Sequence, residues 1–114
     1  MRAIGDAAER LAAAFLEREG YRVVARNVSS RGGELDIVAV EREVLCFVEV
    51  RARASARWGA AEETVGRVKQ ARLARAAEKF LSTWPERDPT CRFDVVAVSP
   101  GPRFTLIRDA FRVG

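Results

Sequence analysis

The sequence predicts an α/β protein in which a mixed β-sheet is flanked by helices. Three observations favour this fold class. Helical periodicity marks one segment near the start of the chain and another after its middle. Short apolar, β-branched runs mark strands, and three of them follow one another before the second helix. A fourth strand follows that helix, which must cross over the sheet to deliver it, so the predicted order is αβββαβ with a final edge strand.

The first helix is expected over residues 4–19, where apolar side chains recur at the spacing of a single helix face. Asp6 is its expected N-cap, and Gly20 is placed to end it. The β-branched segment 21–28 predicts the first strand, and the turn-forming segment 29–33 closes it.

The next two strands are expected over residues 34–40 and 44–50, joined by a short polar segment as an antiparallel hairpin. The second helix is expected over residues 67–81, with Gly66 as its N-cap. The remaining strands are expected at residues 92–98 and, for a short fifth strand, at residues 104–108.

The chain has 114 residues, of which 48% are hydrophobic, and we expect a single domain over residues 1–114. No apolar run approaches the roughly 18 residues that span a bilayer, and the N-terminal segment lacks the pattern of a secretory signal. We therefore expect a cytoplasmic protein with no membrane partner. The 20 Lys and Arg residues against 16 Asp and Glu residues give a net charge of +4, which favours polyanionic partners.

The chain contains no histidine, and this excludes several kinds of active site. It removes Ser-His-Asp and Cys-His nucleophile arrangements and histidine-ligated iron, copper or zinc. Cys46 and Cys91 form no C-x-x-C pair, so we expect reduced, structural thiols. Catalysis by this chain would rely on carboxylates, lysine, arginine, tyrosine, or a metal ion held by oxygen ligands.

Two carboxylates lie in strands that are otherwise apolar. Asp36 is in one strand of the predicted hairpin and Glu49 is in the other. A two-residue loop at positions 42–43 pairs Glu41 with Val44. The same register places Asp36 directly across the ladder from Glu49.

This register sorts the hairpin into two faces of different chemistry. On the carboxylate face, the other expected pairs are Glu34 with Arg51, Val38 with Phe47 and Val40 with Leu45. On the opposite face every expected pair is apolar: Leu35 with Val50, Ile37 with Val48 and Ala39 with Cys46. A one-residue slip would separate the two carboxylates and mix these sets.

Two ionised carboxylates held side by side repel each other, so one takes up a proton or a cation lies between them. A hard divalent ion, Mg²⁺ or Mn²⁺, fits best because it prefers oxygen ligands and retains waters. The alternative is structural: Glu49 pairs with Arg51 or Arg53, and Asp36 pairs with another arginine. The residues alone leave both interpretations open.

The segments around these carboxylates resemble a known nuclease signature. Residues 33–36, Gly-Glu-Leu-Asp, followed by residues 47–51, Phe-Val-Glu-Val-Arg, resemble the D…(D/E)-X-K motif of the PD-(D/E)XK nuclease superfamily. Further blocks are similar to those of the YraN family of predicted, Holliday-junction-resolvase-like endonucleases. These blocks are residues 5–9, 32–36, 47–51, 69–70 and 92–96.

The resemblance implies a restriction-endonuclease-like αβββαβ core and a metal-dependent DNA endonuclease that acts on branched or other structure-defined substrates. It implies Mg²⁺ or Mn²⁺ bound by Asp36 and Glu49, with the Val50 carbonyl as a third ligand. Glu9 on the first helix would approach the same site. The alternative for Glu9 is an ordinary carboxylate at the edge of the apolar stripe.

Arg51 departs from the signature, which has lysine at this position. Arginine stays protonated and cannot act as a base, whereas a buried lysine can lose its proton. Lys69 and Gln70 extend the apolar stripe of the second helix, so either can face the sheet and orient the water or contact the scissile phosphate. The alternative for Lys69 is an ammonium that reaches only solvent. Because of Arg51, the competing function is a nucleic-acid-binding module that kept the fold and lost catalysis.

Basic side chains near the carboxylates form the predicted nucleic-acid surface, with an aromatic ring able to stack on an exposed base. They are Arg51, Arg53, Arg57 and Trp58 in and beside the loop that follows the carboxylate strand, and Arg67, Lys69, Arg72 and Arg75 on the second helix. The alternative is an ordinary solvated face. No helix-turn-helix, zinc-finger or RNA-binding signature is present, which favours recognition of shape over sequence.

The oligomeric state is left open by the sequence. Apolar residues near the C-terminus can cover the edge of the sheet or meet a second copy in a homodimer. They are Phe104, Leu106, Ile107 and Phe111.

Overall fold

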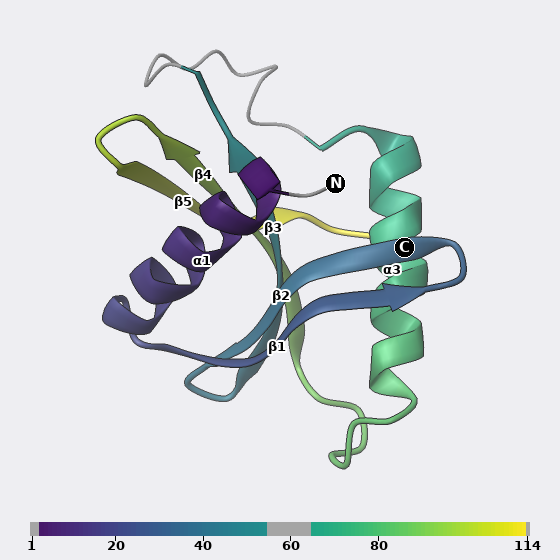
Figure 1. Ribbon diagram of the computed structural model, residues 1–114. Coiled ribbons are helices and arrows are strands. Elements are labelled where there is room, and N and C mark those ends of the chain that lie inside the picture. The colour runs from purple at the N-terminus through teal and green to yellow at the C-terminus, as the bar shows by residue number, and fades with distance from the viewer. Residues whose placement is uncertain (1–2, 55–64, 114) are drawn as a thin grey trace.

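The computed structural model describes residues 3–54 and 65–113 and has the element order αβββαββ (Figure 1). The helices are α1 (Ala3–Arg18) and α3 (Arg67–Leu81), and the strands are β1 (Tyr21–Ser30), β2 (Gly33–Glu41), β3 (Val44–Ala52), β4 (Cys91–Ser99) and β5 (Arg103–Phe111). Every predicted helix and strand is present, and α3 has the predicted bounds. Within the described part of the chain, neither helix is long and apolar enough to cross a membrane.

Two local predictions are wrong. α1 begins at Ala3, so Asp6 lies in the first turn instead of at the N-cap; there its charge still suits the positive end of the helix. β5 continues beyond the predicted residues 104–108 to Phe111. The continuation contains a bulge with Asp109 at a φ of 53°, and this bulge interrupts the alternation of apolar and polar residues.

The sheet is mixed, as predicted, with the strand order β1-β2-β3-β4-β5. Neighbouring strands are antiparallel except β3 and β4, which pair in parallel. Parallel neighbours need a long crossover connection, and α3 lies within that connection. The two helices cover opposite faces of the sheet (Figure 1).

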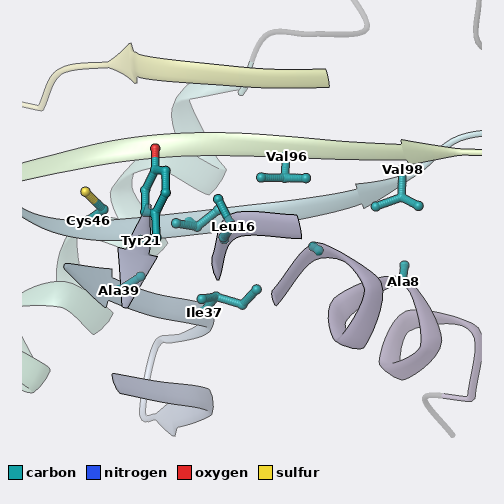
Figure 2. Packing of buried hydrophobic residues seen from close by; sticks show 10 residues of the cluster. Ala8, Leu16, Tyr21, Ile37, Ala39, Cys46, Val96 and Val98 are labelled. Carbon is teal, nitrogen blue, oxygen red and sulfur yellow. The ribbon is translucent and has the colours of Figure 1, made fainter. Parts of the chain in front are cut away.

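Each helix covers an apolar cluster on its own face of the sheet. The cluster beneath α1, drawn in Figure 2, includes Ala12, Leu16, Ile37, Ala39, Cys46, Val48 and Val96. The cluster beneath α3 includes Leu35, Val38, Leu45, Phe47, Leu73, Ala76, Ala77 and Val95. Both faces of the central strand β3 are therefore buried, which explains its nearly continuous apolar sequence.

As expected, neither cysteine is in a disulfide, and burial raises the pKa of the Cys46 thiol to about 12.

The predicted register of the β2–β3 hairpin is confirmed over its regular part. Glu41 pairs with Val44 across the turn, and the ladder continues to Ile37 opposite Val48. The ladder ends at that pair. The pairs expected beyond it, Asp36 with Glu49 and those of the next two residues along β2, lie outside the ladder.

Leu35 lies on the face opposite to the one predicted. It packs in the cluster beneath α3, whereas Ile37 packs beneath α1. Residues two apart share a face in a regular strand, so β2 twists sharply about Asp36. Asn27, at the same level of the paired strand β1, adopts a φ of 53°. This twist turns β2 away from β3 and opens the sheet beside the two carboxylates.

Candidate active site

The carboxylates Asp36 and Glu49 lie where β2 and β3 separate. The backbone N–H of Val50 donates a hydrogen bond of 2.9 Å to Oδ2 of Asp36, so this side chain bridges the two strands beyond the end of their ladder. Glu49 is only 5% exposed. The proximity of Glu49 helps to raise the pKa of Asp36, and both residues line the same cleft, so the two carboxyl groups lie close together. The adjacency predicted from the register therefore holds, although it arises beyond the regular ladder.

The surroundings of Asp36 disfavour its charged form. Burial is the main cause that raises the pKa of Asp36, from an ordinary 3.8 to about 7, and the charge of Glu49 adds to it. The N–H of Val50 and the ammonium of Lys69 act in the opposite direction but are outweighed. The ionised form of Asp36 therefore lacks sufficient compensating positive charge.

Lys69 supplies the cation that contacts the pair. α3 begins at Arg67, and Lys69 in its first turn reaches back to the sheet, with Nζ 2.5 Å from Oε2 of Glu49. The Lys69 side chain is 54% exposed, so its stem runs through solvent while its ammonium is paired. Lys69 thus faces the sheet, as its place beside the apolar stripe of α3 predicted, and does not reach only solvent.

Gln70 faces the start of its own helix. Its side-chain amide donates a hydrogen bond of 2.6 Å to the carbonyl of Val65, and its backbone N–H donates one of 2.9 Å to the carbonyl of Gly66. Gln70 is not among the described residues that line the space around the carboxylates. Its bonds fix the beginning of α3, and thereby the position from which Lys69 extends.

The carboxylates open into a cleft of about 680 Å³ between α3 and the β1–β2 turn. The described residues that line it are Gly32, Gly33, Glu34, Asp36, Glu49, Lys69, Arg72 and Leu73. Gly33 lies so close to α3 that a Cβ there would be 2.4 Å from the carbonyl oxygen of Arg72. This contact requires glycine and holds the turn against the helix, so it fixes the width of the cleft.

Glu9 is not among the described residues that line the cleft. It is fully buried on α1, and Nε of Arg26 lies 3.2 Å from its Oε1. No three acidic or cysteine side chains of the described residues form a metal-binding group. α1 packs on the face of the sheet opposite to α3, and the role of Glu9 at the site stays a prediction.

The predicted basic residues are only partly brought together. Lys69 and Arg72 line the cleft, whereas Arg51, two residues after Glu49 on β3, is not among its described lining residues. Arg53 extends the pairing of β3 with β4 through a backbone hydrogen bond of 2.7 Å to Val98. Arg57 and Trp58 lie outside the described residues.

The carboxylate oxygens of Asp36 and Glu49 are ligands of the kind that a hard divalent cation prefers. Asp36 and Glu49 offer adjacent carboxylate oxygens, and Mg²⁺ is commonly held by one or two carboxylates while it keeps several waters. Glu49 already contacts one cation, the ammonium of Lys69. Val50, whose carbonyl is the expected third ligand, contacts Asp36 through its N–H.

A second cluster of charges, on the face of the sheet that α1 covers, was missed by the sequence reasoning. Asp94 on β4 is fully buried and accepts hydrogen bonds from the Tyr21 hydroxyl at 2.7 Å and from Arg92 at 2.8 and 2.9 Å. Arg92 also bonds to Glu41, which in turn accepts two bonds from Arg108, at 2.9 and 2.6 Å. The available signal was Asp94 itself, a lone acid within an apolar strand.

A family model and several curated relatives match this chain. The family model described as "Uncharacterised protein family UPF0102" matches residues 8–98. A UPF0102 protein of Symbiobacterium thermophilum is 48% identical over 114 residues, covering 96% of this chain and 97% of the relative. A UPF0102 protein of Burkholderia pseudomallei is 51% identical over 112 residues, covering 97% of this chain and 76% of the relative. The chain belongs to the UPF0102 family.

The UPF0102 match includes every described residue that lines the cleft. It begins within α1, spans Asp36, Glu49 and Lys69, and ends within β4. β5 lies beyond the matched span. The part of the chain that defines UPF0102 membership is therefore also the part that builds this site.

Proposed function

We propose that this UPF0102 protein is a divalent-metal-dependent endonuclease of the PD-(D/E)XK type, built as one domain over residues 1–114, that hydrolyses phosphodiester bonds in DNA. The observation that carries the proposal is the adjacency of Asp36 and Glu49 in a cleft that also contains Lys69. A hydrophobic sheet does not need two adjoining carboxylates for its stability, and burial together with the charge of Glu49 raises the pKa of Asp36. The αβββαβ order and the resemblance of residues 33–36 and 47–51 to the nuclease motif add support.

The chemistry follows from the charges in the cleft. When bound by Asp36 and Glu49, Mg²⁺ or Mn²⁺ would activate water and offset the charge that develops on the phosphate. Lys69 and Arg72 line the same cleft and can bind phosphate oxygens from the side of α3. Arg51 stays protonated, so it has no role as a base and can only stabilise negative charge.

Lys69 takes the role that the nuclease signature gives to a lysine two residues after the glutamate. That position holds Arg51 in this chain, whereas the ammonium in contact with Glu49 comes from α3. An ammonium beside the metal ligands is suited to contact the phosphate that is cleaved. Catalysis by this UPF0102 protein would therefore depend on a helix residue in place of a strand residue.

The expected substrates are branched or single-stranded DNA in the cytoplasm. The basic residues of α3 contact phosphates without reading bases, and the chain has no sequence-reading motif. An open cleft beside a basic helix suits a distorted or single strand better than a base-specific groove contact.

The competing proposal is a DNA-binding module without catalysis. Two observations favour it: Arg51 replaces the signature lysine, and Glu9 is paired with Arg26. In that case Asp36 and Glu49 would bind a metal that assists DNA binding only.

Metal-dependent cleavage distinguishes the two proposals. Labelled four-way junction, flap, single-stranded and duplex DNA, with an RNA copy of the single strand, are incubated with Mg²⁺ or Mn²⁺ and with wild type, Asp36→Ala or Glu34→Gln. Glu34→Gln is the matched control, because Glu34 is an exposed carboxylate of the same cleft. We expect cleavage by wild type and by the control but not by Asp36→Ala. Binding without cleavage by wild type under both metals would favour the binding module.

A further inference from the structure

Lys69 lies where a metal ion would meet Glu49. Its Nζ is 2.5 Å from Oε2 of Glu49, and its charge also acts on Asp36. Mg²⁺ contacts carboxylate oxygens at about 2.0–2.1 Å, so an ion bound through Oε2 of Glu49 would occupy the place where the ammonium now lies. Two cations at such short range also repel each other. Lys69 and a divalent ion therefore compete for this position.

Lys69 is able to leave the position without unfolding anything. Its side chain is 54% exposed, whereas Glu49 is 5% exposed, so the carboxylate is fixed and the lysine stem is free to turn. The lysine stem has four flexible carbons, and α3 is held at its start by the bonds of Gln70. Arg72 lines the same cleft but is not the ion-pair partner of Glu49. Arg72 is therefore a suitable control for Lys69, because it has the same charge but does not compete with a divalent ion for Glu49.

We infer that Lys69 is an exchangeable counter-cation of the site. It neutralises Glu49 when no divalent ion is bound, is displaced when one binds, and then turns its ammonium to a phosphate of the DNA. This inference rests on the proposed function and adds a coupling to it. Lys69 weakens metal binding when DNA is absent and links metal binding to phosphate binding, so each strengthens the other.

The first test is the affinity for Mn²⁺, measured from the electron paramagnetic resonance signal of the free ion. Lys69→Met keeps most of the stem and removes the charge, and we expect it to bind Mn²⁺ roughly tenfold more tightly than wild type. Arg72→Met removes a charge of the same cleft without freeing Glu49, and we expect a change of less than about threefold. Asp36→Asn should lose most of the binding, because it removes a proposed ligand.

The second test is the coupling to DNA, measured by fluorescence anisotropy of a labelled phosphorothioate oligothymidylate, which resists cleavage. We expect Mn²⁺ to tighten its binding to wild type and to tighten it several-fold less in Lys69→Met. In that variant no ammonium is released towards the phosphate. Circular dichroism of each variant checks that it is folded before either affinity is compared.

The outcomes separate this inference from the proposed function. Mn²⁺ binding that is equal or weaker in Lys69→Met, together with loss of binding in Asp36→Asn, overturns the exchange and leaves the metal-dependent nuclease standing. Binding in Asp36→Asn that equals wild type, or no binding in any variant, overturns the metal site and the exchange together. Tighter binding in Lys69→Met and loss in Asp36→Asn supports both.

Discussion

At the scale of single residues, Asp36 has the environment least favourable to its own charge. Its carboxyl group is buried beside Glu49, and these two causes raise its pKa to about 7 in the folded protein. In the unfolded chain the same group ionises near its ordinary value of 3.8. As the pH rises between these values, the unfolded state loses its proton first, so the metal-free protein becomes less stable.

Asp36→Asn should therefore stabilise the metal-free protein at alkaline pH. Asparagine still offers an oxygen to the N–H of Val50 but carries no charge beside Glu49. Each unit of pKa shift corresponds to about 1.4 kcal/mol, and we expect a gain on the order of 1–3 kcal/mol at roughly pH 8 that vanishes near pH 4. Urea denaturation in EDTA at several pH values measures it.

Glu34→Gln is the control for this prediction, since it removes an exposed carboxylate of the same cleft. Its stability should follow that of wild type at every pH. An Asp36→Asn protein less stable than wild type at pH 8 would contradict the assigned environment. A residue kept at the expense of stability is typical of a functional site.

At the scale of elements, the approach of the β1–β2 turn to α3 decides the shape of the cleft. Gly33→Ala would place a Cβ 2.4 Å from the backbone carbonyl of Arg72, and neither backbone can yield locally. We expect a loss of roughly 1–3 kcal/mol in the free energy of unfolding, together with weaker Mn²⁺ and DNA binding, because the turn must move away from the helix.

Gly66→Ala is the matched substitution for this test. Gly66 has a φ of −65°, and a Cβ there would have nothing within 4 Å. Thermal denaturation should show little change for this variant and a clear fall in melting temperature for Gly33→Ala. Equal melting temperatures for the two variants would mean that the turn does not press on α3.

The helices and strands were largely predictable from the sequence, because the spacing of apolar residues and the positions of turn residues are local signals. The hairpin register could be read from the segregation of Asp36 and Glu49 from the apolar residues, and it is correct as far as Ile37. The twist about Asp36 could not be predicted from the sequence, because Asn27 of the neighbouring strand adopts a left-handed conformation at the same level. That twist is what separates β2 from β3 and opens the site.

The partners of charged side chains were predictable only in part. The spacing on α3 predicts that Lys69 can face the sheet, but the helix must be docked before its contact with Glu49 is known. Glu9 pairs with Arg26 on the face of the sheet that α1 covers, and its spacing on the helix did not predict this partner. Helical spacing tells which side of a helix is buried but does not tell against which face of a sheet it packs.

At the scale of the whole molecule, one polar network joins strands that are distant in the sequence. Tyr21 at the start of β1 donates to Asp94 on β4, 73 residues away, at 2.7 Å. Arg92 and Arg108 connect the same cluster to Glu41 at the end of β2. Burial, followed by the bond to Asp94, raises the pKa of Tyr21, so its hydroxyl stays protonated and keeps donating.

Tyr21→Phe tests whether this network stabilises the fold independently of the site. It removes one hydrogen bond to a buried carboxylate while the ring remains, so we expect a loss of roughly 1–3 kcal/mol in the free energy of unfolding. Mn²⁺ affinity should be unchanged, because the cleft lies on the opposite face of the sheet, beside α3, and its described lining does not include Tyr21. Denaturation measures the free energy of unfolding, and Mn²⁺ titration of the same preparation measures the affinity. An altered Mn²⁺ affinity would contradict the independence of the polar network from the cleft.

The distribution of charge over the two helices predicts which face of the molecule binds DNA. α3 has no acidic residue in its first turn and brings Lys69 and Arg72 to the cleft, whereas α1 carries the exposed Arg10 on the opposite face. Each phosphate contact to a single strand adds about 0.7 to the slope of log affinity against log salt concentration. Arg72→Ala should therefore weaken binding of single-stranded DNA and lower this slope, and Arg10→Ala should change neither. Anisotropy titrations at several salt concentrations measure both quantities. If Arg10→Ala lowered the slope as much as Arg72→Ala, binding would follow net charge alone, and α3 would have no special part in it.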